Sequence, residues 1–459
     1  MKRFIAGVIL LALAGLAVYG YTVTRREQTY RALIGQGDAA VAQGSALTAI
    51  EAFSGAIALN GTAMIGYLKR GDAYRRRGDL EPARRDLLRA AELDPTAARP
   101  RELLGDVEYA QKRYARAVQR YREYVRLDDR SPRVLYKLAL AQFSAGDSTG
   151  AIGALRQAIA IDDRFAEAYY LLGLCLRDRQ QPDGARRALE RSVALAPATL
   201  HAREELADLY GAIGRTDDRL AELEALSALD AGPSREVTLG LAYARAGQPD
   251  RAVLTLSDAA RRYPDHTYTY VALGRVWLER ARAGGGRIAL RKALGALQNA
   301  VGNDDSSEAM MLLGRVLLML ADNDSAERVL REAAGKQPAD PAAFYYLADA
   351  AERLHHWDVA RQALLDYATL RGVEREPRHR AAEATRLGDL SLRLGDADAA
   401  VGYFQHALVD EPGAALLPRL ADAEWRAGEK GAARATLAQA LEKDPRNPQA
   451  LALRARFRR

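Results

Sequence analysis

The chain has 459 residues and a formal net charge of +7; 28% of its residues are charged and 49% are hydrophobic. This composition is typical of a helix-rich soluble body, and the modest charge, with Arg alternating with Asp and Glu, argues against a nucleic-acid-binding surface. We expect these charges to form i,i+4 pairs on solvated helix faces. One cysteine, Cys175, excludes an intramolecular disulfide framework and a cysteine-based zinc site, and its apolar surroundings in the sequence predict a buried thiol.

The first 27 residues differ from the rest of the chain. Residues 4–23 carry no charge, and two basic residues flank them on each side. Twenty helical residues span about 30 Å, the thickness of a bilayer's hydrocarbon core, so residues 1–27 predict a single-pass membrane anchor. A cleaved signal peptide and a buried helix remain alternatives, because a small-residue triplet such as Ala12-Leu13-Ala14 permits cleavage. The basic residues are balanced and leave the orientation open. In the commoner arrangement for this layout, a short N-terminal stub precedes the anchor and the body is exported. We therefore expect the repeats outside the cytoplasm, as in the periplasm.

From residue 28 onward a small residue recurs at a near-constant step. The first five intervals are equal, and only two later intervals are markedly longer. The step of about 34 residues is typical of a helix–turn–helix unit that buries its apolar face by stacking on its neighbours. The twelve positions are Gly37, Gly71, Gly105, Ala139, Gly173, Ala207, Gly240, Gly274, Gly314, Ala348, Gly388 and Ala421.

Other positions of the unit recur with the same period. A second small residue follows in the next helix, a large apolar residue comes one turn after that, and proline often closes the unit. Small residues let two antiparallel helices approach closely, and proline stops a helix because it lacks an N–H. Residues 233–266 show the pattern best, in the order Leu239, Gly240, Tyr243, Gly247, Ala252, Leu256, Ala259, Pro264. One unit departs from it, with Arg219 where a small residue belongs.

These positions resemble the tetratricopeptide repeat family, and about twelve units cover most of the chain. The resemblance implies an all-α, right-handed α-solenoid of bacterial type, preceded here by the transmembrane helix. Two insertions interrupt it. Residues 280–288 predict a flexible loop, since their glycines lack the ending of a phosphate loop, and residues 371–379 predict a hinge. We therefore expect a main body over 28–372, further repeats over 373–447 and a capping helix over 448–459.

Catalytic and metal-binding motifs are missing from the sequence. None of the six histidines lies in an HExxH motif, and the chain has no GxSxG, Rossmann or Walker motif. The repeated units account for nearly the whole chain and leave no room for a catalytic domain. We expect no enzymatic activity, no cofactor and no metal.

The resemblance implies that partners bind in the groove formed by the first helix of each unit. At the groove positions this chain mixes aromatic residues with arginine, both of which are enriched at interface hot spots. The alternative for any one aromatic residue is packing between neighbouring helices. The candidate residues are Arg99, Tyr109, Tyr136, Phe143, Tyr170, Arg177, Tyr268, Arg275, Arg315 and Tyr345.

The sequence thus predicts a membrane-tethered scaffold that binds a protein or peptide segment in this groove, for envelope or secretion-complex assembly. One alternative is a polysaccharide-handling or export-associated module, in which tyrosine and arginine contact glycan or a synthase partner. A second alternative is an enzyme or its regulatory half. The Lys and Asn residues with which some members of this family grip chaperone carboxylates are missing, so such partners are disfavoured.

Overall fold

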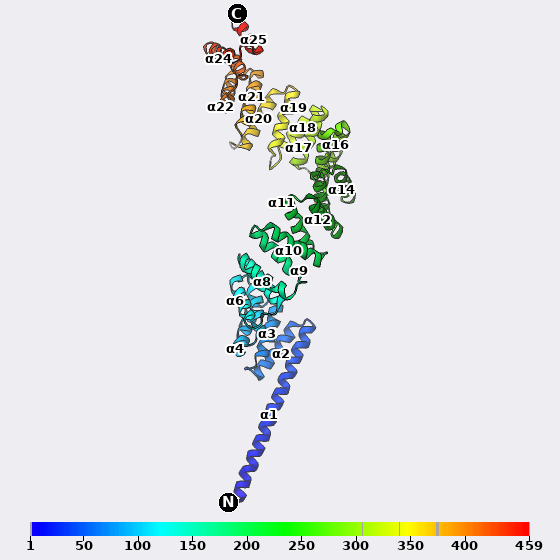
Figure 1. The fold of residues 1–459 in the computed structure, drawn as a ribbon, viewed down its shortest axis with the longest axis vertical. Coiled ribbons are helices and arrows are strands. Elements are labelled where there is room, and N and C mark those ends of the chain that lie inside the picture. The colour runs from blue at the N-terminus through cyan, green and yellow to red at the C-terminus, as the bar shows by residue number, and fades with distance from the viewer. Residues whose placement is uncertain (1, 305, 339, 373–375, 459) are drawn as a thin grey trace. The chain divides into compact units, whose positions relative to one another are not determined.

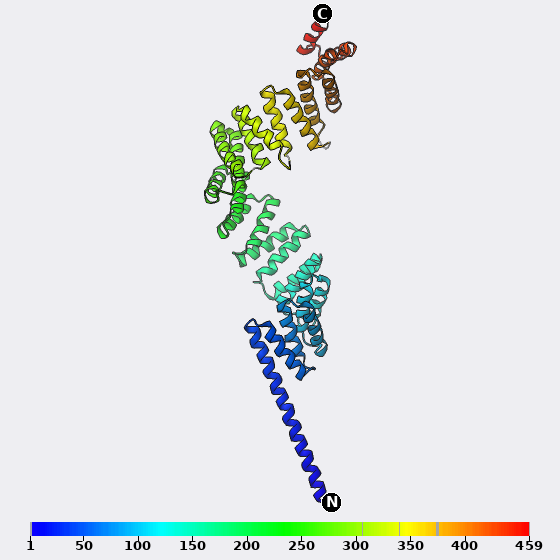
Figure 2. The ribbon, with the colours of Figure 1, turned by 180° about the vertical axis from the view of Figure 1, so that it is seen from behind.

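The structure is a computed structural model that describes residues 2–458 except 305, 339 and 373–375; of residues 2–8 and 12 it describes only the backbone. Within this part of the chain all regular elements are helices, which confirms the predicted all-α repeat architecture (Figures 1 and 2). Contacts divide the chain into two units, residues 1–222 and 223–459, and the boundary falls inside one helix, α12 (Thr216–Leu229).

In the first unit each helix from α1 to α11 packs on the next one along the chain. An antiparallel pair therefore forms one repeat, and the second helix of each pair also supports the first helix of the following pair. The helices are α1 (Lys2–Ala42), α2 (Ala46–Leu59), α3 (Met64–Arg77), α4 (Leu80–Leu93), α5 (Arg99–Ala110), α6 (Tyr114–Val125), α7 (Pro132–Ser144), α8 (Ser148–Ile161), α9 (Ala166–Asp178), α10 (Pro182–Leu195) and α11 (Leu200–Ala212).

The second unit repeats this arrangement, with each helix from α13 to α25 packed on the next. The helices are α13 (Pro233–Arg245), α14 (Pro249–Arg262), α15 (Thr267–Arg280), α16 (Gly286–Asn303), α17 (Ser307–Leu320), α18 (Asn323–Ala334), α19 (Pro341–Arg353), α20 (Trp357–Arg371), α21 (Pro377–Arg393), α22 (Ala397–Asp410), α23 (Leu417–Arg426), α24 (Lys430–Lys443) and α25 (Pro448–Phe457). Several helices begin with proline in their first turn, where the missing N–H has no intrahelical partner to lose.

The recurring small residue lies where the two helices of a repeat touch. A Cβ atom added to Gly240 would approach Leu256 Cγ to 2.6 Å, and one added to Gly71 would approach Leu87 Cγ to 2.8 Å. Both leucines are fully buried. The large apolar residue therefore fills the space that the missing side chain leaves, as the period predicts.

The turn between the two helices of a repeat uses a left-handed residue. Gly78, Gly146 and Gly247 have positive φ angles of 91°, 83° and 73° at this point. Glycine adopts this conformation without steric cost, which explains its recurrence there. Ala321 adopts it without being glycine, with a φ of 66°.

The insertion at residues 280–288 forms helical turns with non-helical backbone at Gly284 and Gly286, where the sequence predicted a flexible loop. Residues Ala281–Gly285 form a π-helical turn (η1) that links α15 to a lengthened α16. Gly284, with a φ of 109°, permits the kink between them, and the buried Ala289 and Leu290 fix the start of α16. The expected hinge at 371–379 lies partly outside the described residues.

The last helix, α25, covers the end of the second unit. Phe457 is 5% exposed and stacks on Trp425 of α23, with ring centroids 4.1 Å apart.

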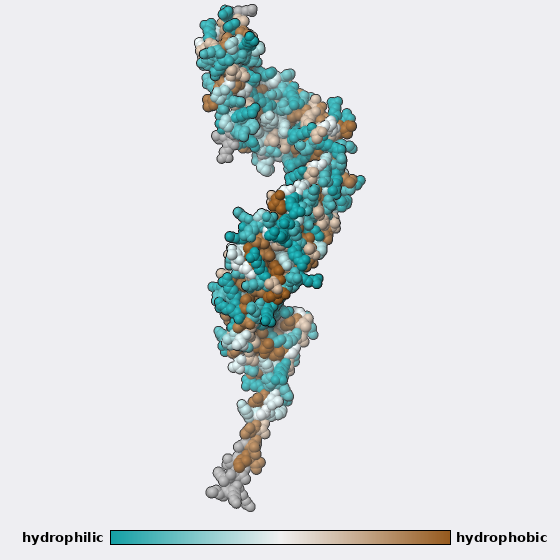
Figure 3. Space-filling view, viewed as in Figure 1, coloured by the Kyte–Doolittle hydropathy of each residue, from teal (hydrophilic) through white to brown (hydrophobic). Residues whose placement is uncertain are grey.

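The first helix, α1, runs without a break from Lys2 to Ala42, so its second half serves as the first helix of the first repeat. Its hydrophobic residues before Arg25, such as Leu13, Leu16 and Val18, are exposed (Figure 3). Among the described residues, no helix has the length and apolarity needed to cross a bilayer, so the transmembrane helix expected over residues 4–23 is not confirmed.

Candidate functional site

Three of the predicted tyrosines lie close together on the first helices of three successive repeats. Tyr109 is on α5, Tyr136 on α7 and Tyr170 on α9, and all three are half-buried against the same hydrophobic core. Burial raises the pKa of Tyr136, and the neighbouring Glu167, Tyr109 and Tyr170 add to this rise. With the half-buried Phe143 they form a surface that we call the aromatic strip.

Contacts on both sides hold the aromatic strip in place. The Tyr109 hydroxyl lies 3.1 Å from Ser144 Oγ, one repeat further on. The Tyr136 ring packs on Phe165, with centroids 5.2 Å apart. Fixed rings of this kind offer contact area at a small entropy cost.

The predicted arginines differ from the tyrosines, because three of them are engaged in ion pairs. Arg99 pairs with Glu102 in its own helix, Arg177 with Glu205 of the next repeat, and Arg275 with Glu308 of the next repeat. A ligand would compete with these carboxylates. The pairs of Arg177 and Arg275 link neighbouring repeats, whereas that of Arg99 stays within α5.

The predicted residues of the second unit are more exposed. Tyr268 is 44% exposed and Tyr345 is 41% exposed. The Tyr345 ring lies 5.7 Å from that of Tyr346, whose face is 5.6 Å from the guanidinium carbon of Arg315. Arg315 Nη2 is buried, and no described residue accepts a hydrogen bond from it.

A charged cluster beside the aromatic strip was not singled out from the sequence. Lys137 Nζ donates to Glu102 Oε1 at 2.8 Å and to Asp106 Oδ1 at 2.7 Å. Arg133 lies 2.6 Å from Glu102 Oε1, and the Tyr121 hydroxyl donates to Asp106 Oδ1 at 2.8 Å. The cluster borders a cavity of about 280 Å³.

Glu102 is the centre of this cluster, and its side chain is 1% exposed. Burial alone would raise its pKa, but the hydrogen bond and charge of Lys137 and those of Arg99 outweigh burial, so the pKa of Glu102 falls below its ordinary value of 4.5. Burial and the neighbouring Asp106 raise the pKa of Tyr121 far above 10.0, so its hydroxyl stays protonated as a donor.

The signal for this cluster was the spacing of charges across one repeat. Lys137 lies 31 residues after Asp106 and 35 after Glu102. The same kind of link joins Lys69 to Asp38 and Arg386 to Glu352. The prediction of i,i+4 pairs on solvated faces is therefore incomplete, since many pairs bridge neighbouring repeats.

Comparisons with known proteins identify the repeat. A profile of the tetratricopeptide repeat matches residues 68–132, 136–199, 237–300, 289–341 and 311–373, and a second profile of this repeat matches residues 391–457. The chain belongs to the tetratricopeptide repeat family. The matches begin after the first repeat, yet that tetratricopeptide unit has the same packing, with Gly37 against the buried Phe53.

Solved structures of similar proteins include other tetratricopeptide repeat proteins. A structure of MamA is 27% identical, covers 35% of this chain and 93% of its own, and has a TM-score of 0.34. YrrB, described as a TPR protein with an unusual peptide-binding site, is 22% identical over 39% of this chain and 93% of its own, with a TM-score of 0.36. A tetratricopeptide repeat protein from Parabacteroides merdae is 17% identical over 54% of this chain and 99% of its own, with a TM-score of 0.40. No curated protein matches the chain.

The described residues contain no group of three or more His, Cys, Asp or Glu side chains that could hold a metal ion. Cys175 is buried, as predicted, and burial raises the pKa of its thiol to about 12, with Asp178 adding to the rise. A neutral, enclosed thiol is a poor nucleophile.

Proposed function

We propose that this tetratricopeptide repeat protein is a non-catalytic scaffold that binds a protein or peptide segment along the aromatic strip. The observation that carries the proposal is that Tyr109, Tyr136 and Tyr170, on three successive repeats, pack half-buried on one hydrophobic core. Such a surface is long and open, which suits an extended or helical segment better than a small molecule. Aromatic rings held by their own repeat are common anchors of protein interfaces.

Attachment to a membrane through the uncharged stretch of α1, which we call the tether, is a further part of the proposal. Residues 4–23 carry no charge, and the exposed Leu13, Leu16 and Val18 belong to this stretch. We propose that it holds the protein on a membrane, with the repeats on the extracytoplasmic side and a role in assembling envelope or secretion complexes. The support is the sequence pattern alone.

Photo-crosslinking tests the binding surface. A photoreactive phenylalanine at Tyr136 or Tyr170 replaces one aromatic ring by another in the full-length chain, so the fold is retained. We expect each variant to crosslink to a defined protein in the cells that make the chain. The measurement is the mass of the crosslinked species, identified by mass spectrometry.

The control places the same group at Arg116 or Arg122, both exposed on α6 and without an ion pair among the described residues. These positions should give no crosslink to the same protein. Crosslinks from α6 but not from the aromatic strip would show that the partner binds elsewhere. Crosslinks to polysaccharide alone would support a glycan-handling role instead.

A further inference from the structure

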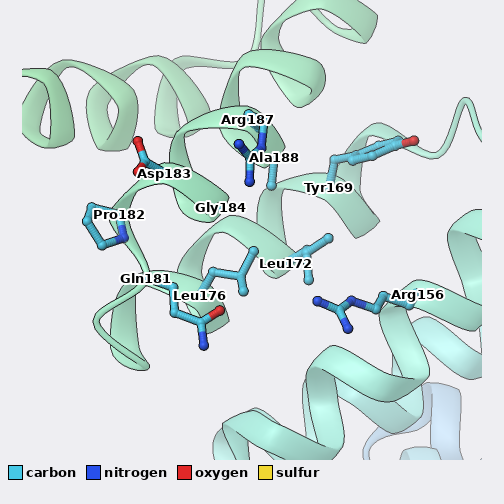
Figure 4. A pocket seen from close by; sticks show the side chains of 10 residues that line it. All are labelled: Arg156, Tyr169, Leu172, Leu176, Gln181, Pro182, Asp183, Gly184, Arg187 and Ala188. Atoms are coloured by element: carbon cyan, nitrogen blue, oxygen red, sulfur yellow. The ribbon is translucent and has the colours of Figure 1, made fainter.

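A second surface lies between α8 and α10, and its lining residues are different from those of the aromatic strip. It is an open groove of about 550 Å³, which we call the α8–α10 groove. Its floor is apolar and comes from Leu172 and Leu176 of α9 and Ala188 of α10. In Figure 4, Arg156 and Arg187 lie on different sides of this floor, with their guanidinium groups directed toward it.

Both arginines are exposed. Among the described residues, neither Arg156 nor Arg187 makes an ion pair or a side-chain hydrogen bond. The one acidic residue of the groove, Asp183, points away from the floor in Figure 4. Of the other arginines on α9 and α10, Arg177 is paired with Glu205 and Arg186 with Glu190, while Arg191 lies over the Tyr169 ring.

The next repeat has carboxylates at two of the corresponding positions. Glu190 has the position in that repeat that Arg156 has in this one, and it accepts a hydrogen bond of 2.8 Å from Tyr210. Glu222 likewise takes the position of Ala188 and accepts a hydrogen bond of 2.5 Å from Arg203. There the chain supplies two carboxylates of its own, whereas the α8–α10 groove has an arginine and an alanine in their places.

We propose that the α8–α10 groove binds an acidic segment of another protein. An aliphatic side chain of the segment would cover Leu172 and Leu176, and its flanking carboxylates would pair with Arg156 and Arg187. Ion pairs beside a dry apolar contact contribute more favourable binding free energy than ion pairs in open water, because the surrounding dielectric constant is lower. This site does not depend on the aromatic strip.

The groove fits an acidic protein segment better than nucleic acid. Nucleic-acid affinity rises with the number of phosphates neutralised, and this groove offers two free cations around an apolar floor. The floor needs an apolar partner, which a peptide provides next to its carboxylates.

Selection from a random peptide display library on the full-length chain tests the proposal. We expect enrichment of peptides in which Leu, Ile or Val is flanked by Asp or Glu. Replacing both arginines, Arg156→Glu with Arg187→Glu, should lower the affinity for the best such peptide at least tenfold at low salt. The difference should shrink as salt rises, because the charge pairs lie at an open groove.

Two controls make the result specific. Arg116→Glu with Arg122→Glu reverses two exposed charges on α6, unpaired among the described residues, and should leave the affinity unchanged. A peptide whose acidic residues are replaced by lysine should bind the Arg156→Glu, Arg187→Glu variant better than the original chain. Circular dichroism should show the same melting for both variants, since none of the four arginines has an ion-pair partner in the described chain to lose.

Failure to enrich acidic, aliphatic peptides would overturn the proposal, as would enriched peptides that bind the double variant equally well. Sedimentation of the chain with phosphatidylserine vesicles that depends on both arginines, without peptide enrichment, would assign the groove to lipid instead. Ala at Tyr136 and Tyr170 should leave these peptides bound, which separates this site from the aromatic strip.

Discussion

At the residue scale, the buried Glu102 shows how a charge is used between repeats. Its carboxylate joins Arg99 of its own helix to Arg133 and Lys137 of the next repeat. A buried carboxylate without cations would be strongly disfavoured, and the cations in turn are held in place by it. The residue therefore fixes how α5 and α7 lie against each other beside the aromatic strip.

Replacing this residue, Glu102→Gln, should lower the free energy of unfolding by about 1–3 kcal/mol at pH 7, since Arg133 and Arg99 are half-exposed and regain water. The pKa of Glu102 is lowered in the folded state, so its contribution is present above 4.5 and is lost as the pH falls through the folded value. Urea unfolding at pH 7 and pH 3 should show a smaller difference between variant and parent at pH 3. The matched control, Asp38→Asn, breaks an exposed pair with Lys69 and should cost less than about 1 kcal/mol.

At the element scale, the contact between the two helices of a repeat depends on a missing side chain. Gly240 on α13 lies against the buried Leu256 of α14, while Gly295 on α16 has no atom within 4 Å of an added Cβ. The two glycines are both helical, so they separate the effect of packing from the effect of helix propensity.

We expect Gly240→Leu to cost about 1–3 kcal/mol by overpacking this contact. The loss of hydrogen-exchange protection should centre on α13 and α14 and fade along the stack, because each repeat touches only its neighbours. Gly295→Leu should be neutral or slightly stabilising. Equal effects of the two changes would refute the packing account.

The turn after α17 offers a change that stabilises. Ala321 ends this helix in the left-handed conformation, with a φ of 66° and a ψ of 21°, where most other repeats have glycine and three have Lys112, Gln180 or His355. Ala321→Gly should raise the free energy of unfolding by about 1 kcal/mol, because the side chain is strained there. Ala246→Gly, at a φ of −78°, should lower it. Thermal unfolding measures both; a lower melting temperature for Ala321→Gly would contradict the strain.

At the scale of the whole molecule, the period of the sequence predicted the fold. The ion pairs of the site were not predicted, because their partners lie about one repeat apart in the sequence. Gly240 and Leu256 belong to the same repeat and meet within it, so the pattern alone placed them. Arg177 and Arg275 were predicted as ligand contacts. In the structure they form ion pairs with Glu205 and Glu308, which lie one repeat further along the chain. The helical insertion was missed because the glycines of residues 280–288 suggest a loop, whereas the packing of Leu290 favours a helix.

Membrane fractionation tests the proposed tether on the full-length chain. We expect it to stay with membranes after carbonate extraction. Leu13→Arg with Leu16→Arg puts two charges into the uncharged stretch, each costing about 2.5–3.5 kcal/mol at a bilayer's centre, and should release the chain. Leu13→Ile with Leu16→Ile is the control and should stay bound. Recovery of the intact parent chain in the soluble fraction would refute the tether.

The unbroken course of α1 has a geometric consequence for the first repeat. Each residue of a helix turns it by about 100° and advances it by about 1.5 Å. If the exposed first half of α1 is held in place, the number of residues between it and the second half determines how the first repeat is rotated about the helix axis. One residue inserted before Arg26 would rotate the first repeat about the axis of α1 by about a quarter turn. Seven inserted residues would nearly restore its original orientation and move it about 10 Å further along the axis. The length of α1 therefore determines the orientation of the first repeat relative to the exposed half of the helix.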